Sequence, residues 1–92
     1  MSSFLNISAN TAATVVAKTA AKLRTVTINT KGSASNQLVL YDNASAASGT
    51  KIGTFDTTVQ PGYIEFCGLQ TVNGLVAVLQ TGGAADITIV WD

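Results

Sequence analysis

The stretch LRTVTINT, residues 23–30, indicates the fold class, because apolar and polar side chains alternate along it. Val26 and Ile28 fall on one side of an extended chain, and Thr25 and Thr27 fall on the other. Since successive side chains of a β-strand point to opposite faces of a sheet, this two-residue period predicts a strand with one buried face and one exposed face.

Similar runs recur along the whole chain, separated by turns rich in small residues. In the closing segment DITIVWD (86–92), Ile87, Ile89 and Trp91 lie on the side opposite to Thr88. β-Branched and aromatic residues dominate these runs, as they do in half-buried strands. The alanines of the second run also favour a helix, which leaves a short helical turn open at 19–22. The expected strands are residues 4–8, 13–18, 23–30, 37–42, 51–56, 62–67, 75–80 and 86–92.

Seven or eight short antiparallel strands with frequent turns predict an all-β fold, a compact β-sandwich. A jelly roll is the leading arrangement. An immunoglobulin-like sandwich is the alternative, although the chain lacks the Cys–Trp–Cys framework of true immunoglobulin domains. The length predicts one domain, 1–92, in which residues 1–11 are either an N-terminal arm or the first strand. The order of the strands stays open.

The turns carry more specific expectations. The dipeptide Asn73-Gly74 strongly favours a two-residue hairpin turn. In KGSASN (31–36), Gly32 is free to take a positive φ. The loop NASAASGT (43–50) joins two strands of a second hairpin, and a β-bulge in it would shift the register by one residue. The expected cross-strand partners are Asp42 with Lys51, Leu40 with Gly53, and Leu38 with Phe55.

The charge content excludes several classes of protein. Charged residues make up 11% of the chain, against about 25% in an ordinary domain, and the net charge is zero. Lys18, Lys22 and Arg24 are the nearest approach to a basic patch, so we expect no direct contact with nucleic acid. Neither a secretory signal nor an apolar run of bilayer length is recognisable, so we expect synthesis in a cytoplasm and no membrane partner.

Catalysis is not expected. The chain has no His, so neither a Ser–His–Asp nor a Cys–His site can form. Cys67 alternates with Tyr63 and Glu65 and is expected to be a small buried hydrophobe. The sequence contains no nucleotide-binding loop and no motif for a cofactor.

The sequence suggests two binding functions. Asp42, Asn43 and Asp56 would supply oxygen ligands for Ca²⁺ if they met at one end of a sandwich, but their spacing matches no calcium loop. A turn in which Asn43 bonds its own backbone is favoured, and no metal is expected. Tyr41 and Tyr63, on the polar sides of their strands, offer a platform for a glycan or, in preference, for another protein.

Association is the function that the composition favours. A charge-poor surface is weak at keeping molecules apart, and edge strands with few Lys residues invite pairing with another chain. The apolar residues near the N-terminus would contact a neighbour if that segment were an arm. The candidate interface residues are Phe4, Leu5, Ile7, Tyr41 and Tyr63.

The runs LRTVTINTKGSASNQLVLYDNASAASGTKIGTFDTT (23–58) and TGGAADITIVWD (81–92) resemble small structural proteins of tailed bacteriophages. In those proteins the pattern VTINTKG…LYDN…SGTKI…T joins the strands of a compact sandwich. The resemblance implies a virion component on the capsid surface, a decoration (cement) protein that stabilises the shell. It also implies a homo-oligomer, often a trimer, that binds the major capsid protein. The alternatives are a small tail or neck protein and a host-surface glycan-binding module.

Overall fold

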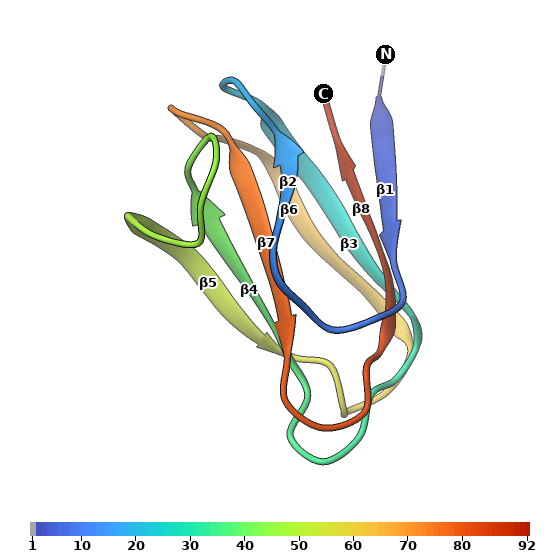
Figure 1. Ribbon diagram of the computed structural model, residues 1–92. Coiled ribbons are helices and arrows are strands. Elements are labelled where there is room, and N and C mark those ends of the chain that lie inside the picture. The colour runs from blue at the N-terminus through green and yellow to red at the C-terminus, as the bar shows by residue number, and fades with distance from the viewer. Residues whose placement is uncertain (1) are drawn as a thin grey trace.

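The alternating runs form eight antiparallel β-strands in the computed structural model, which describes residues 2–92 (Figure 1). Each end of a strand lies within three residues of its expected position. Residues 19–22 form no helical turn, and in residues 2–92 no helix is long and apolar enough to cross a membrane. The strands are β1 (Ser3–Ile7), β2 (Thr11–Ala17), β3 (Lys22–Thr30), β4 (Gln37–Asp42), β5 (Thr50–Asp56), β6 (Gly62–Gln70), β7 (Leu75–Gln80) and β8 (Asp86–Trp91).

The strands form two four-stranded sheets that pack face to face. Sheet A has the order β1-β8-β3-β6, and sheet B has the order β2-β7-β4-β5. The pairs β1–β8, β2–β7, β3–β6 and β4–β5 are therefore nested, as in a two-stranded ribbon that is rolled up. This nesting is the jelly roll, so the leading expectation is confirmed and the immunoglobulin-like order is wrong.

The N-terminal segment is the first strand and not an arm. β1 pairs with β8, with Leu5 opposite Ile89 and Ile7 opposite Ile87. Ile7 is buried in the core, and Leu5 packs against it. Two inward side chains thus fix β1 to its own sandwich.

The core lies between the sheets, and its buried residues come from six strands, β1, β2, β3, β4, β7 and β8, together with Ala85 just before β8. The inward positions expected for β3 and β8 are confirmed, since Val26, Ile28, Ile87 and Ile89 are buried and Trp91 packs against them. The buried cluster contains Ile7, Val16, Leu23, Val26, Ile28, Leu38, Leu40, Leu75, Ala77, Leu79, Ala85, Ile87 and Ile89.

The register of the β4–β5 hairpin is correct as far as Leu40 and then shifts. Leu38 pairs with Phe55 and Leu40 with Gly53, as expected. A bulge after Leu40 then pairs Tyr41 with Lys51 and Asp42 with Thr50. The expected Asp42–Lys51 pair is therefore wrong by one residue, because two chain segments of unequal length oppose each other there.

Asn73-Gly74 does not close a hairpin, because the loop that contains it carries the chain from sheet A to sheet B. Gly74 serves close packing instead. A Cβ on Gly74 would lie 2.6 Å from the carbonyl oxygen of Ala17 and 2.7 Å from that of Asn43. The positive φ expected of Gly32 is found two and three residues further on, at Ala34 and Ser35.

Candidate functional site

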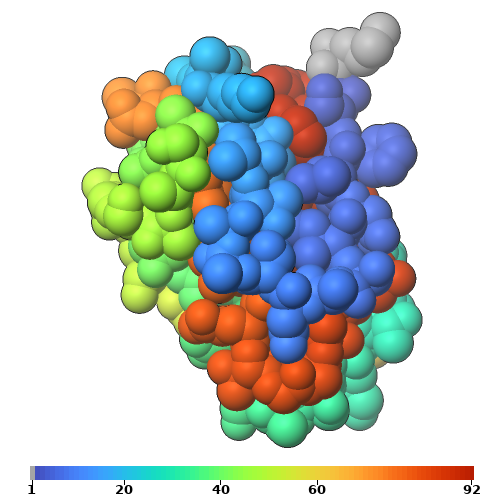
Figure 2. Space-filling view, viewed as in Figure 1, coloured from blue at the N-terminus to red at the C-terminus, as the bar shows by residue number. Residues whose placement is uncertain are grey.

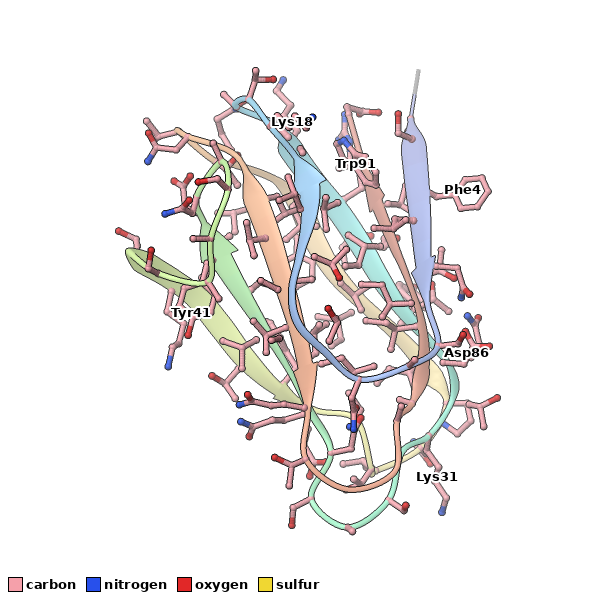
Figure 3. The ribbon with its side chains drawn as sticks, viewed as in Figure 1. Phe4, Lys18, Lys31, Tyr41, Asp86 and Trp91 are labelled. Carbon is pink, nitrogen blue, oxygen red and sulfur yellow. The ribbon has the colours of Figure 1, made fainter. Side chains whose placement is uncertain are left out.

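Of the five candidate interface residues, Phe4 and Tyr63 share one face of the molecule. Both point outward from sheet A, and their side chains are 73% and 71% exposed. Figure 3 shows the Phe4 ring directed away from the sandwich at the β1 edge. Leu5 and Ile7 belong to the interior and are not available to a partner.

Tyr41 lies on the other sheet, so it cannot form one platform with Tyr63. It is part of β4 in sheet B, where it is half buried. The ammonium nitrogen of Lys51 lies 5.8 Å from the centre of its ring, within the range of a cation–π contact. The ring of Tyr41 therefore has a partner within its own hairpin.

The outward residues of sheet A form two cross-strand rows, which we call the outer strip. The first row is Phe4, Val90, Thr25 and Glu65, and the second is Asn6, Thr88, Thr27 and Tyr63. Phe4 and Tyr63 stand on the two end strands, β1 and β6. Short uncharged side chains lie between the two rings, and Glu65 is the one charged group of the eight.

Two asparagines fix the end of the outer strip near Asp86. The Asn6 amide donates to the Asp86 carboxylate at 2.6 Å and to the backbone carbonyl of Ile87 at 2.9 Å. From the other side, the Asn29 amide donates to the same carboxylate at 3.2 Å and to the Thr88 hydroxyl oxygen at 3.0 Å. Three strands are thereby tied together on their outward side.

An ion pair neutralises charge at the opposite end. The Nε of Arg24 lies 2.6 Å from a carboxylate oxygen of Asp92, and the Ser2 hydroxyl donates to the other oxygen at 2.7 Å. The Ser2 hydrogen bond and then the Arg24 hydrogen bond hold the pKa of Asp92 below its ordinary value. Charged groups at both ends are therefore engaged within the chain, and the centre of the strip stays uncharged.

The outer face of sheet B differs, because a loop of the chain partly covers it. Val76 and Val78 alternate with core residues of β7 and point outward, yet they are 0% and 5% exposed. The loop between β4 and β5 folds back toward β7, with Ala44 Cα 2.9 Å from the position of a Gly74 Cβ. Figure 2 shows this loop, in yellow-green, beside β2 on this face. Sheet A therefore offers the more open face.

The polar groups that could bind a metal ion do not converge. Asp42 and Asp56 lie at opposite ends of the β4–β5 hairpin, so the arrangement considered for Ca²⁺ is wrong. The Asn43 side chain accepts from the backbone N–H groups of Ser45 and Ala46, as in the favoured turn. Residues 2–92 contain no group of three or more His, Cys, Asp or Glu side chains that could hold a metal ion.

Cys67 is exposed, which corrects the expectation that it is buried. It follows Tyr63 and Glu65, which lie on the outward face of β6 opposite Thr27 and Thr25. Its positive φ of 54° and the φ of 76° at Gly68 mark a bulge in β6. The Glu65 carboxylate accepts from the Cys67 N–H at 3.0 Å and so satisfies a donor at the bulge.

A shallow depression of about 360 Å³ at the other end of the sandwich is polar and open. Its one carboxylate, Asp56, accepts from the backbone N–H and the hydroxyl of Thr58 at 2.8 and 2.6 Å. The Thr58 hydroxyl, followed by its N–H, lowers the pKa of Asp56. This carboxylate is therefore satisfied within its own turn. The depression is lined by Ser35, Asn36, Gln37, Thr54, Asp56 and Thr58.

The sequence placed individual residues of the outer strip correctly but could not assemble them. Thr25, Thr27 and Thr88 were expected on outward faces, which the structure confirms. Which strands lie side by side depends on contacts distant in sequence, so the Asn6–Asp86–Asn29 group was missed.

No family model matches the chain, and no curated protein sequence matches it.

Proposed function

We propose that this chain is a structural protein of a bacteriophage virion, a capsid decoration protein that binds the shell through the outer strip of sheet A. The observation that carries the proposal is the pair of exposed aromatic rings, Phe4 and Tyr63, at the two edges of a strip with an uncharged centre.

The physical chemistry of the strip suits protein contact. Protein interfaces are enriched in aromatic residues and depleted of charge at their centres. Thr25, Thr27 and Thr88 are short, so they present a flat surface with hydroxyl groups that can donate and accept hydrogen bonds. The hydrogen bonds of Asn6 and Asn29 to Asp86 hold the strip in shape before a partner arrives.

The partner follows from the phage resemblance of residues 23–58 and 81–92. The proposed partners are the major capsid protein and further copies of this chain, and the proposed location is the outer surface of the capsid. A small, charge-poor domain can add apolar burial where capsomers meet and so stabilise the shell. The role is structural, without catalysis.

Sedimentation with empty phage capsids tests the proposal. The protein should pellet with the capsids at a saturable ratio, and Phe4→Asp should weaken binding by about tenfold or more, because it replaces an exposed ring by a charge. Tyr41→Ala, a change on the other sheet, should bind like the unmodified chain. Equal losses in the two variants, or no pelleting at all, would count against the proposal.

The arrangement of the tyrosines favours this role over glycan recognition by Tyr41 and Tyr63 together, since the two side chains lie on different sheets. On a glycan array we expect no specific binding. Binding that disappears in Tyr41→Ala or in Tyr63→Ala would favour the glycan-binding alternative.

A further inference from the structure

β6 is an end strand of sheet A, and within residues 2–92 no strand is hydrogen-bonded to its outer edge. Edge strands present unpaired backbone N–H and C=O groups, and proteins usually protect them with Lys, Pro, bulges or a covering segment. β6 contains no Lys or Arg, and Glu65 is its one charged residue. Residues 62–66 of this edge, before the bulge at Cys67, are therefore weakly protected against pairing.

The other end strands are less suited to pairing. β5 carries Lys51, whose ammonium group lies beside the ring of Tyr41 on the neighbouring strand β4. β2 is interrupted by two register shifts. β1 has five residues, as many as the regular part of β6, but a two-fold axis at its central residue sets Phe4 opposite Asn6 and gives no complementary pair. The bulge at Cys67 and Gly68 restricts regular pairing of β6 to Gly62–Phe66.

This regular part of β6 is complementary to itself in the antiparallel direction. With a two-fold axis at Ile64, Tyr63 stands opposite Glu65 of the partner subunit, so a phenol faces a carboxylate twice. Gly62 stands opposite Phe66 of the partner subunit and leaves room for its ring. Directly opposed side chains contribute to strand pairing, and a two-fold contact uses each pair twice.

A half-buried apolar seam runs beside the same edge. Ile52 and Phe55 of β5, together with Ile64 and Phe66 of β6, are neither fully buried nor fully exposed. The Phe55 and Phe66 rings meet edge to face with centroids 5.5 Å apart, which links the two sheets at their end strands. A second copy paired along β6 would remove part of this seam from water.

We infer that two copies of this chain pair antiparallel through residues 62–66 of β6, with Ile64 at the two-fold axis. Pairing joins the two A sheets into one eight-stranded sheet and places the two outer strips side by side. The inference depends on the β6 edge alone and holds whether or not the outer strip binds a capsid. It specifies a dimer, where the phage resemblance implies a trimer.

Light scattering after size exclusion, over a series of protein concentrations and without capsids, measures the association. The expected mass at high concentration is twice the 9.4 kDa of the chain. A monomer at every concentration, or a trimer, overturns the inference.

Charge variants test which edge is used. Tyr63→Glu sets a carboxylate opposite the Glu65 carboxylate of the partner subunit and should weaken dimerisation by about tenfold or more. Tyr63→Lys sets an ammonium group there and should preserve the dimer. Phe4→Glu changes an equally exposed ring on β1 and should also preserve it. A dimer that resists Tyr63→Glu, or that Phe4→Glu weakens as much, overturns the inference.

A cross-link tests the register. Opposed Cα atoms in an antiparallel pair lie about 4.5–5.5 Å apart, within the range that a disulfide spans. Under oxidation, Ile64→Cys in a Cys67→Ser background should form a covalent dimer, and Thr54→Cys in the same background should not. Equal cross-linking of both variants, or none for Ile64→Cys in a folded protein, contradicts the register.

Discussion

At the scale of single residues, Asn36 joins several loops at one end of the sandwich. Its side chain is 1% exposed. The amide nitrogen donates to the carbonyl oxygens of Gln80 and Thr81 at 3.1 and 2.8 Å, and the amide oxygen accepts from the Thr57 hydroxyl and the Ala85 N–H at 2.6 and 3.1 Å. One buried amide thus satisfies backbone groups at the end of β7 and just before β8.

Asn36→Ala should lower the free energy of unfolding by about 2–4 kcal/mol, because it leaves buried donors and acceptors without partners. Asn29→Ala removes an exposed amide and should change it by about 0.5 kcal/mol or less. Urea denaturation followed by circular dichroism measures both values. Similar losses in the two variants would show that the buried hydrogen bonds of Asn36 contribute less to the free energy of unfolding than expected.

Asp42 makes stability depend on pH. The backbone N–H of Val72, followed by that of Asn73, donates to its carboxylate and lowers its pKa below the ordinary 3.8. The folded state therefore binds this proton less tightly than the unfolded chain does. The resulting stabilisation is fully present above pH 3.8 and is lost as the pH falls through the lower folded-state pKa.

Asp42→Asn should therefore destabilise the protein at pH 7, and its deficit relative to the unmodified chain should shrink on acidification. Val72→Ala keeps the N–H and removes no titratable group, so its effect should not vary with pH in this way. Urea midpoints measured from pH 7 down to the acid transition provide the comparison. A deficit of Asp42→Asn that is constant over this range would contradict the assignment.

At the scale of elements, the two faces of β3 and β8 have opposite roles. Val26 pairs with Ile89 on the core side, and Thr27 pairs with Thr88 in the outer strip. A step of one residue along either strand therefore leads from a side chain on the core face to one on the solvent face.

Ile89→Asp should unfold the domain, because it places an unpaired carboxylate where the side chain is 0% exposed. A loss of about 4 kcal/mol or more would be comparable to the whole stability of a small domain. Thr27→Lys, one strand away on the other face, should keep the fold and weaken capsid binding. Circular dichroism and capsid sedimentation separate these effects, and unfolding of Thr27→Lys would mean that the faces of β3 are assigned wrongly.

The sequence predicted elements better than connections. β4 and β7 were predicted at their observed bounds, because local alternation and turn residues determine where a strand begins and ends. The sequence left open whether a bulge interrupts the β4–β5 hairpin, and it predicted Cys67 to be buried, since both features depend on how segments of unequal length match across a sheet. Asn73-Gly74 shows the same limit, because a turn tendency does not determine which sheet the next strand joins.

At the scale of the whole molecule, the jelly roll explains how a charge-poor chain forms a surface suited to assembly. The fold brings β1 and β6, far apart in sequence, to the two edges of one sheet, which places Phe4 and Tyr63 on the same face. The charges at the two ends of this face are engaged within the chain, through Asp86 with Asn6 and Asn29 and through Asp92 with Arg24. Low charge is therefore a property of a particular surface as well as of the composition.

Cryo-electron microscopy of purified virions tests the central proposal most directly. The proposal predicts density for this jelly roll on the outside of the capsid, with the outer strip of sheet A against the shell and Phe4 at the contact. Absence of the chain from the shell, or attachment through sheet B with Phe4 exposed to solvent, would contradict it.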